Sequence, residues 1–322
     1  MLSPSAILDP IREDLIKVED SLDSISRAHV GYLSELLAHS LGSGGKRIRP
    51  TLTLLSGRFY SYDLDCLLPM AVAVELLHTA SLVHDDIIDK SAVRRGQPTV
   101  YEVWGQDKAI LVGDYLFARA GAVCATTGNL RVIKLFSQTL AAISIGELQE
   151  AFDTFNLEQT REHYLDRIVK KTASLFVLAA ESGAILSQAP ERSVEILREY
   201  GHNLGIAFQI VDDVLDFTGT EEELGKPVGS DLSQGILTLP MMLLLEHYPE
   251  DNPIKRYFQN RSELENKRQV IELIRNSPIV QECYGIAASY AAKACQNLNL
   301  LPDNASRQAL IDLADYIVRR RK

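Results

Sequence analysis

Two acidic motifs with the same pattern, DDxxD, are the strongest chemical signal in the sequence. The first occupies residues 85–89 and the second residues 212–216, and each follows a long apolar run. Positions i and i+4 lie one turn apart on a helix face, so each motif directs two carboxylates the same way. Such carboxylates suit Mg²⁺, which binds one or two of them together with water and substrate phosphates. The expected metal ligands are Asp85, Asp89 and Asp212. The other expected catalytic carboxylates are Asp86, Asp213 and Asp216, which could bind the metal directly, bind it through water, or orient the residues that do.

The simplest alternative is that these aspartates are solvated acids at helix ends. That interpretation fits poorly, because negative charge near a helix C-terminus opposes the helix dipole. Like charges on one helix face also repel each other. A di-iron site is disfavoured as well, since neither motif contains the Glu-x-x-His pair that such bundles use.

Basic residues gather near the acidic motifs. The segment GGKRIRP, residues 44–50, combines three cations with two glycines, which let a backbone approach a phosphate closely. The segment RRGQP, residues 94–98, follows the first motif by five residues. His78 lies two turns before the first motif and Gln209 shares the face of the second, although a lone histidine in an apolar helix is usually a core residue. Together these groups predict a pocket for a diphosphate head with a hydrocarbon tail.

Long helices are the elements that must position these groups. The sequence has few Gly and Pro residues, and we find no clear strand, hairpin or βαβ pattern. Several helices are apolar nearly all round, which indicates burial within a ring of other helices. We expect one all-α domain over residues 1–322, with turn-rich breaks at 42–45, 94–99 and 218–233. The expected helices cover residues 7–40, a segment beginning near Pro50, 64–89, 107–126, 130–153, 160–187, 191–217 and 235–247, and two or three more follow.

Composition limits the classes of function. The 322 residues carry a formal charge of −10, which disfavours general nucleic-acid binding and attraction to acidic membranes. The four cysteines lie far apart without a CxxC pair, so a zinc site is disfavoured and a reducing compartment is favoured. No signal-peptide or transit-peptide pattern and no run of 18 uncharged apolar residues is present. We therefore expect a cytoplasmic protein without a transmembrane segment.

Seven segments of the chain, taken in order, resemble the trans-isoprenyl diphosphate synthases. They are GGKRIRP (44–50), ELLHTASLVHDDIID (75–89), RRGQP (94–98), KTASLF (171–176), FQIVDDVLDF (208–217), GKPVGSDL (225–232) and TLP (238–240). Both DDxxD motifs together with RRGxP and FQxxDD form a highly specific combination. The resemblance implies an all-α bundle around a central catalytic cavity and a homodimer. It also implies Mg²⁺-dependent, head-to-tail condensation of isopentenyl diphosphate onto an allylic diphosphate.

The resemblance implies roles for individual residues too. The residues expected to bind isopentenyl diphosphate are Lys46, Arg49, His78 and Arg95. Those expected to bind the allylic diphosphate are Arg94, Lys171, Thr172, Gln209 and Lys226, of which Lys171 is also expected to be catalytic. One departure is Ile236, because many members carry Lys after the corresponding glycine. One cationic contact to the allylic diphosphate is therefore expected to be missing or supplied elsewhere.

The length of the product is expected to depend on the residues beneath the first motif. Ala80 and Ser81 lie one helical turn deeper than Asp85, and both are small. In the family that the sequence resembles, bulky aromatic residues at these positions act as a floor that stops elongation early. A tunnel is therefore expected, bounded by Leu77, Val74, Ala141, Ala142 and Ile145. We favour a long-chain all-trans polyprenyl diphosphate synthase of hexaprenyl to decaprenyl type, which supplies quinone side chains. The alternative for the small residues is that they only permit close packing of helices.

Three other functions are weighed against this interpretation. A short-chain synthase making geranylgeranyl or farnesyl diphosphate is the nearest alternative. A non-catalytic partner subunit is disfavoured because both acidic motifs are present. A terpene cyclase or head-to-head synthase is disfavoured because GGKRIRP and RRGQP would be unneeded for a single allylic substrate.

Overall fold

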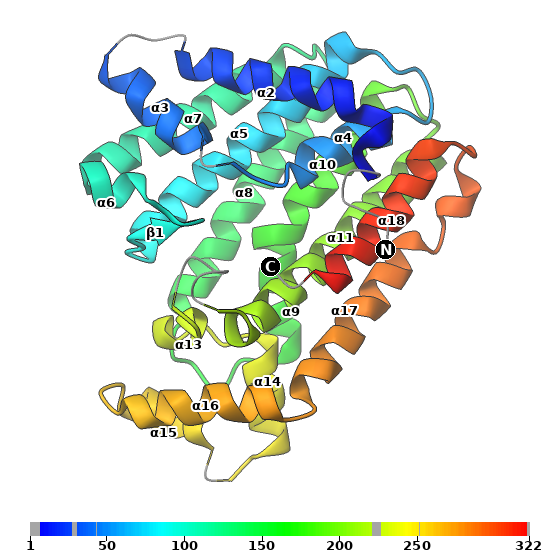
Figure 1. Ribbon diagram of the computed structural model, residues 1–322. Coiled ribbons are helices and arrows are strands. Elements are labelled where there is room, and N and C mark those ends of the chain that lie inside the picture. Colours follow the sequence, from blue (N-terminus) through cyan, green and yellow to red (C-terminus); the bar gives the residue numbers. More distant parts are fainter. Residues whose placement is uncertain (1–6, 28–30, 43, 221–226, 251, 321–322) are drawn as a thin grey trace.

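The protein is an assembly of long helices, which confirms the all-α fold expected from the sequence (Figure 1). The computed structural model describes residues 7–27, 31–42, 44–220, 227–250 and 252–320. Side-chain caps fix several of the helix starts: Asp63 accepts a hydrogen bond from the Asp65 N–H, and Asn129 accepts hydrogen bonds from the N–H groups of Arg131 and Val132. The first half of the chain comprises the 3₁₀-helix η1 (Asp9–Ile11), α2 (Arg12–Arg27), α3 (Tyr32–Gly42), α4 (Ile48–Gly57), α5 (Leu64–Ile88), α6 (Val100–Trp104), α7 (Gln106–Ala125) and α8 (Leu130–Phe152).

The second half contains the helix that carries the second acidic motif, α11 (Glu191–Thr218). Helices α9 (Arg161–Ile168) and α10 (Ser174–Leu186) form one rod, interrupted by the π-helical segment η2 (Val169–Ala173). Single π-helical turns often occur at functional sites, and this one carries Lys171 and Thr172. The remaining elements are α13 (Ser230–Gln234), α14 (Leu239–His247), α15 (Pro253–Gln259), α16 (Leu264–Asn276), α17 (Ile279–Cys295), the 3₁₀-helix η3 (Leu298–Leu300) and α18 (Ala305–Arg319).

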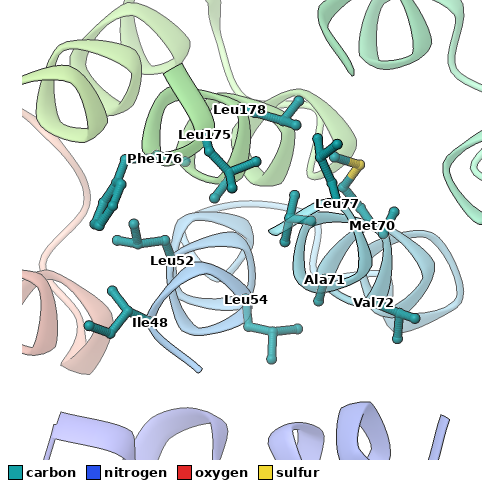
Figure 2. Packing of buried hydrophobic residues seen from close by; sticks show 14 of the residues in the cluster. Ile48, Leu52, Leu54, Met70, Ala71, Val72, Leu77, Leu175, Phe176 and Leu178 are labelled. Carbon is teal, nitrogen blue, oxygen red and sulfur yellow. The ribbon is translucent and has the colours of Figure 1, made fainter. Parts of the chain in front are cut away.

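The helix that carries the first acidic motif lies in the centre of the core. Figure 2 shows side chains of α4, α5 and α10 meeting there, including Leu52, Leu77 and Phe176, which are fully buried. Helix α5 also packs along α7, and α10 packs along α11. Both acidic motifs therefore stand on helices that are held firmly by buried apolar contacts.

Helix α5 is also the one described helix that is long and apolar enough to cross a membrane, judged by length and composition. However, 67% of its most apolar window is buried inside the protein. Packing against α4, α7 and α10 accounts for this apolar sequence, so α5 is weak evidence for a membrane span. The absence of a transmembrane segment stays a prediction.

Residues 93–98, which were expected to be a loop, form a hairpin beside the first acidic motif. Strands β1 (Val93–Arg94) and β2 (Gln97–Pro98) pair antiparallel. Arg95 and Gly96 form the turn with φ angles of 52° and 75°, as in a type I′ turn. Arg is not a usual residue at the first turn position and each strand has only two residues, so the hairpin has almost no sequence signal.

Other differences concern the ends of helices. The expected helix over residues 7–40 is divided into α2 and α3, and Gly31, with a φ of 72°, begins the second part. The turn-rich segment 218–233 contains the short helix α13, and four α-helices rather than two or three follow residue 252. None of these differences moves an acidic motif off its helix.

Candidate active site

A cavity of about 250 Å³ lies between the two acidic motifs. Asp89 of the first motif and Asp213 of the second both line it, so helices α5 and α11 face the same space. The cavity carries equal numbers of acidic and basic side chains. The acidic residues are Asp89, Glu150, Asp213 and Asp231, and the basic residues are Arg94, Arg95, Arg167 and Lys171. This mixture suits a site that holds both cations and anions.

The first motif divides into two kinds of carboxylate. Burial raises the pKa of Asp85 and of Asp89 to about 6 each, against the attraction of Lys171 and Arg94. Asp86 is buried and accepts a 2.7 Å hydrogen bond from Arg94 Nε. Asp89 lines the cavity, Asp85 lies one turn before it, and Asp86 holds Arg94 in place.

Lys171 lies among four carboxylates. Its Nζ is 2.6 Å from Glu150 Oε1 and 2.9 Å from Glu147 Oε2, both on α8. Burial alone would lower the pKa of Lys171, but Glu150, Asp85 and Glu147 raise it. Burial and the nearby charge of Asp85 in turn raise the pKa of Glu147 to about 7. Lys171 is therefore held as a charged ammonium by the carboxylates around it.

A chain of hydrogen bonds connects the π-helical segment to the second motif. Thr172 Oγ1 donates to Gln209 Oε1 at 2.6 Å, and Gln209 Nε2 donates to Asp213 Oδ1 at 2.8 Å. The Tyr164 hydroxyl donates to Asp213 Oδ2 at 2.6 Å. Burial raises the pKa of Asp213 to about 8, and the charge of Asp231 adds to this. Asp213 is thus a supporting group inside the protein, and it orients Gln209 toward the cavity.

The other aspartates of the second motif have separate environments. Asp216 is buried, and its Oδ2 accepts a 3.2 Å hydrogen bond from the Asp231 N–H, which attaches α13 to α11. Asp212 is more exposed, and its Oδ1 lies 2.7 Å from Arg320 Nη2 at the end of the chain. Lys226, which was expected at the allylic diphosphate, lies outside the described residues.

A second, smaller cavity of about 40 Å³ adjoins the RRGQP hairpin. His78 and Arg95 both line it, with Arg47 and Arg94. Burial lowers the pKa of His78 well below its usual value, and the charges of Arg49, Arg95, Arg94 and Arg47 lower it further. Two of these arginines are paired with carboxylates that line the same cavity, Arg47 with Glu75 and Arg94 with Asp86. Arg95, whose guanidinium lies against the Gly44 carbonyl, is the arginine best placed to meet an anion there.

Two of the residues expected at isopentenyl diphosphate lie elsewhere. The Arg49 guanidinium stacks 5.0 Å from the Phe176 ring centroid, and its Nε is buried without a hydrogen-bond partner. Burial lowers the pKa of Arg49 to about 10. Lys46 lines a third cavity, of about 360 Å³, beside α2 and α18, and it reaches over the Tyr316 ring. The structure thus brings His78 and Arg95 to one cavity, buries Arg49 against Phe176 and places Lys46 at a different cavity.

The residues expected to set product length are deep in the fold. Leu77 and Ala80 are fully buried, and the half-buried Ser81 donates its hydroxyl to the His78 carbonyl at 2.8 Å. One part of the expected tunnel wall was wrong, because Ala141 and Ile145 lie on the exposed face of α8. The buried face of α8 carries other residues, namely Val132, Phe136, Thr139, Ile143 and Gly146. Both faces of this helix are apolar, so its sequence does not show which one is inside.

The carboxylates do not yet form a closed metal site. Within the described ranges, no three acidic, His or Cys side chains form a group that could hold a metal ion. Lys171 lies between the carboxylates of the first motif and those of α8. Arg320 forms an ion pair with Asp212. A metal ion would therefore have to displace these cations or arrive together with an anion that attracts them.

Sequence reasoning missed several residues of this site. Tyr164 and Arg167 lie seven and four residues before Lys171, the spacing of one helix face, so periodicity could have found them. Glu147 and Glu150 had no partner visible in the sequence. Arg320 is 108 residues away from Asp212 in the chain, and only the tertiary fold brings them together.

Comparisons with known proteins agree with this fold and site. A family model described as polyprenyl synthetase matches residues 30–274. The chain is 41% identical to heptaprenyl diphosphate synthase component 2 of Geobacillus stearothermophilus, over 96% of this chain and 97% of that protein. It also superimposes on the crystal structure of heptaprenyl diphosphate synthase from Staphylococcus aureus with a TM-score of 0.93 and 38% identity, over 97% of this chain and 99% of that one.

A second solved structure of similar fold contains calcium and isoprenyl diphosphate. It is a polyprenyl synthase from Caulobacter crescentus complexed with calcium and isoprenyl diphosphate, with a TM-score of 0.94 and 35% identity over 99% of this chain and 98% of that one. The family model and these relatives extend over nearly the whole fold and both acidic motifs, which confirms the resemblance seen in the sequence. The chain belongs to the polyprenyl synthetase family.

Proposed function

We propose that this protein is a Mg²⁺-dependent prenyltransferase that condenses isopentenyl diphosphate head to tail onto an allylic diphosphate. One observation carries the proposal: a single cavity is lined by Asp89 and Asp213, from the two acidic motifs, and by four basic side chains. Carboxylates that can hold a divalent cation and cations that can hold a diphosphate belong together in such an enzyme.

The residues present fit Mg²⁺. Asp85 and Asp89 offer hard oxygen donors, and burial has raised the pKa of each to about 6. Crowded, partly desolvated carboxylates gain a counter-charge when a divalent cation binds. We propose that Asp85, Asp89 and Asp212 hold the metal, as expected from the sequence, after Arg320 has left Asp212.

The residues of the π-helical segment are proposed to bind the allylic diphosphate. Lys171, Thr172 and Gln209 all line the cavity. The charge of Lys171 stabilises the departing diphosphate as the allylic C–O bond breaks, and Thr172 and Gln209 orient it. Mg²⁺ would neutralise further negative charge on the same leaving group. Arg94, which Asp86 holds beside the cavity, contributes a second cation.

The hairpin and the small cavity are proposed to hold isopentenyl diphosphate. His78 and Arg95 line this cavity, and Arg49 approaches His78 closely enough to lower its pKa. Lys46 would have to turn from the Tyr316 ring to join them. Once the diphosphate is held, the isopentenyl double bond can attack the allylic cation, and a proton is then lost.

We propose a long-chain product of hexaprenyl to decaprenyl type. Leu77 and Ala80 lie in the core below the first motif, and Ser81 is small and half-buried. Two of the similar proteins are named heptaprenyl diphosphate synthases, which supports this choice. A short-chain product remains the alternative, and analysis of the product lengths separates the two.

We further propose that the protein is a homodimer in which helices α7 and α8 meet a second copy. These neighbouring helices expose large apolar side chains, namely Ile110, Leu111, Ile145, Leu148 and Phe152. Large apolar side chains exposed on two neighbouring helices are a feature of protein interfaces. The name of the Geobacillus relative contains the words "component 2", so a separate partner protein is the competing occupant of this surface.

A cytoplasmic location is also proposed. All four cysteines are free thiols, as expected for a reducing compartment.

The direct test uses purified protein with labelled isopentenyl diphosphate, farnesyl diphosphate and Mg²⁺. We expect incorporation of the label into products of 30 to 50 carbons, which corresponds to six to ten isoprene units. Products of 20 carbons or fewer would support the short-chain alternative, and no incorporation with or without added cell extract would contradict the proposed function.

A further inference from the structure

A buried arginine that was not singled out from the sequence lines the cavity between the two acidic motifs. Arg167 is only 3% exposed, yet it belongs to the cavity wall together with Lys171 and Thr172. It lies four residues before Lys171, at the end of α9, so the two cations share one helix face. A buried guanidinium on the wall of a cavity is costly unless it has partners.

The two hydrogen bonds of Arg167 go to uncharged acceptors. Its Nη2 donates to the Leu237 carbonyl at 2.8 Å, and its Nη1 donates to Gln159 Oε1 at 3.1 Å. Both acceptors are neutral. The nearest carboxylate oxygen, Glu150 Oε2, is 3.6 Å from Nε, and the other oxygen of Glu150 already accepts from Lys171.

The side chain beside Arg167 in the cavity wall is uncharged. Ile236 lines the same cavity and directly precedes Leu237, whose carbonyl holds the guanidinium. An anion in the cavity therefore meets an apolar side chain at position 236 and a cation immediately next to it.

We propose that Arg167 binds the allylic diphosphate directly and supplies the cationic contact that Ile236 cannot make. Two of its five N–H groups hold it to Leu237 and Gln159, and the others can donate to phosphate oxygens. Arg167 and Lys171 then act as a pair, one turn apart, on the same leaving group. This inference rests on the proposed function, because it assumes that the anion in the cavity is an allylic diphosphate.

The test measures binding of farnesyl thiodiphosphate, an unreactive allylic analogue, by titration calorimetry in the presence of Mg²⁺. The variants are Arg167→Gln, Ile236→Lys and the double variant. Arg167→Gln is expected to weaken binding by about 10- to 100-fold, because it removes a charged hydrogen-bond donor. Ile236→Lys is expected to restore at least about tenfold in the Arg167→Gln background but to gain less than about threefold in the intact chain.

A matched control separates this role from general loss of a helix cation. Arg161 lies on the same helix, pairs with Glu246 and does not line this cavity, so Arg161→Gln is the control. It is expected to leave binding unchanged. Arg167→Met, which keeps an apolar stem, provides the same comparison if Arg167→Gln does not fold. The KM for isopentenyl diphosphate is expected to change by less than about threefold in all variants.

Two results would overturn the inference. One is wild-type affinity for the analogue in Arg167→Gln or Arg167→Met, and the other is an equal gain from Ile236→Lys in both backgrounds. Either result, obtained with a wild-type enzyme that elongates isopentenyl diphosphate, leaves the proposed function intact. Failure of the wild-type enzyme to elongate would instead count against the function itself.

Discussion

Gly146 of α8 lies so close to Lys171 that a β-carbon at position 146 would be 2.8 Å from the Lys171 backbone nitrogen. That distance is shorter than real β-carbons tolerate, so an alanine must push the π-helical segment away from α8. The same segment carries Thr172. The ammonium group of Lys171 is held by Glu150. The absence of a side chain at position 146 thus sets the position of Lys171.

We therefore predict that Gly146→Ala lowers kcat by at least about tenfold, because displacement of a positioned charge by about 1 Å is costly in an active site. Steady-state kinetics with farnesyl and isopentenyl diphosphates measures the effect. Gly121→Ala on α7 is the control, since the nearest atom to its added β-carbon is 3.9 Å away. Equal activity of the two variants would show that the close approach to Lys171 is unimportant.

The product is expected to shorten when the space below the first motif is filled. Ser81→Phe adds a ring one turn below Asp85, where Ser81 now bonds to the His78 carbonyl. Ser289→Phe is the matched control, because the Ser289 hydroxyl also donates to a carbonyl three residues earlier but lies at the surface. Thin-layer or mass analysis of the products should show shorter chains only for Ser81→Phe.

The companion change Ala80→Tyr carries a different expectation. Ala80 is fully buried, and a tyrosine there overfills a packed position, so we expect reduced stability together with any shortening. If Ser81→Phe leaves the distribution of chain lengths unchanged, the tunnel does not pass Ser81.

An acid-sensitive contact is predicted where α2 meets α4. Asp14 is buried, and although burial alone would raise its pKa, hydrogen bonds from Tyr62, Arg58 and Lys17 hold it below its ordinary value. A carboxylate with a lowered pKa stabilises the fold above its unfolded-state pKa of about 4, and this stabilisation is lost as the pH falls through the lower folded-state pKa.

We therefore expect Asp14→Asn to reduce the free energy of unfolding by about 1–3 kcal/mol at pH 6. Urea unfolding of both proteins measures the difference, which should shrink below pH 4. Asp20→Asn, an exposed change on the same helix, should have little effect at either pH. A wild-type minus Asp14→Asn difference that does not depend on pH would contradict this explanation.

The oligomeric state can be tested at the exposed face of α8. Leu148 is 58% exposed there, next to Phe152. If a second copy covers this face, Leu148→Glu buries a charge and should yield monomers in sedimentation experiments. Leu264→Glu on α16, where Leu264 is 64% exposed, should not change the sedimentation. A monomeric wild-type protein that gains activity and mass with a second protein would favour a heteromer.

The sequence was informative wherever chemistry repeats along one helix. The spacing of Asp85 and Asp89 placed these two side chains on one helix face, and the structure adds that Asp89 and Gln209 line one cavity. Gln209 was expected on the face of Asp212 and Asp216, but the structure shows it bonded to Asp213. Periodicity also predicted most helices, because apolar residues follow the buried side of each helix.

What the sequence did not show depends on contacts between distant segments. The pairing of Asp212 with Arg320 and the direction of Lys46 toward Tyr316 follow from the packing of α18, which no local pattern encodes. The inward face of α8 was misjudged because apolar residues occur on both of its sides. The predicted role of Arg94 was incomplete, because its ion pair with Asp86 forms only when the hairpin folds back onto α5.

The measurement that tests the central claim most directly is the turnover number of Asp85→Ala with farnesyl and isopentenyl diphosphates across a range of Mg²⁺ concentrations. We predict a loss on the order of 100-fold or more that added Mg²⁺ does not restore, equivalent to about 3 kcal/mol of transition-state stabilisation. Asp65→Ala, at the exposed opposite end of α5, should retain normal turnover. Near-normal turnover of Asp85→Ala would contradict the claim that the two acidic motifs hold the metal and diphosphates between them.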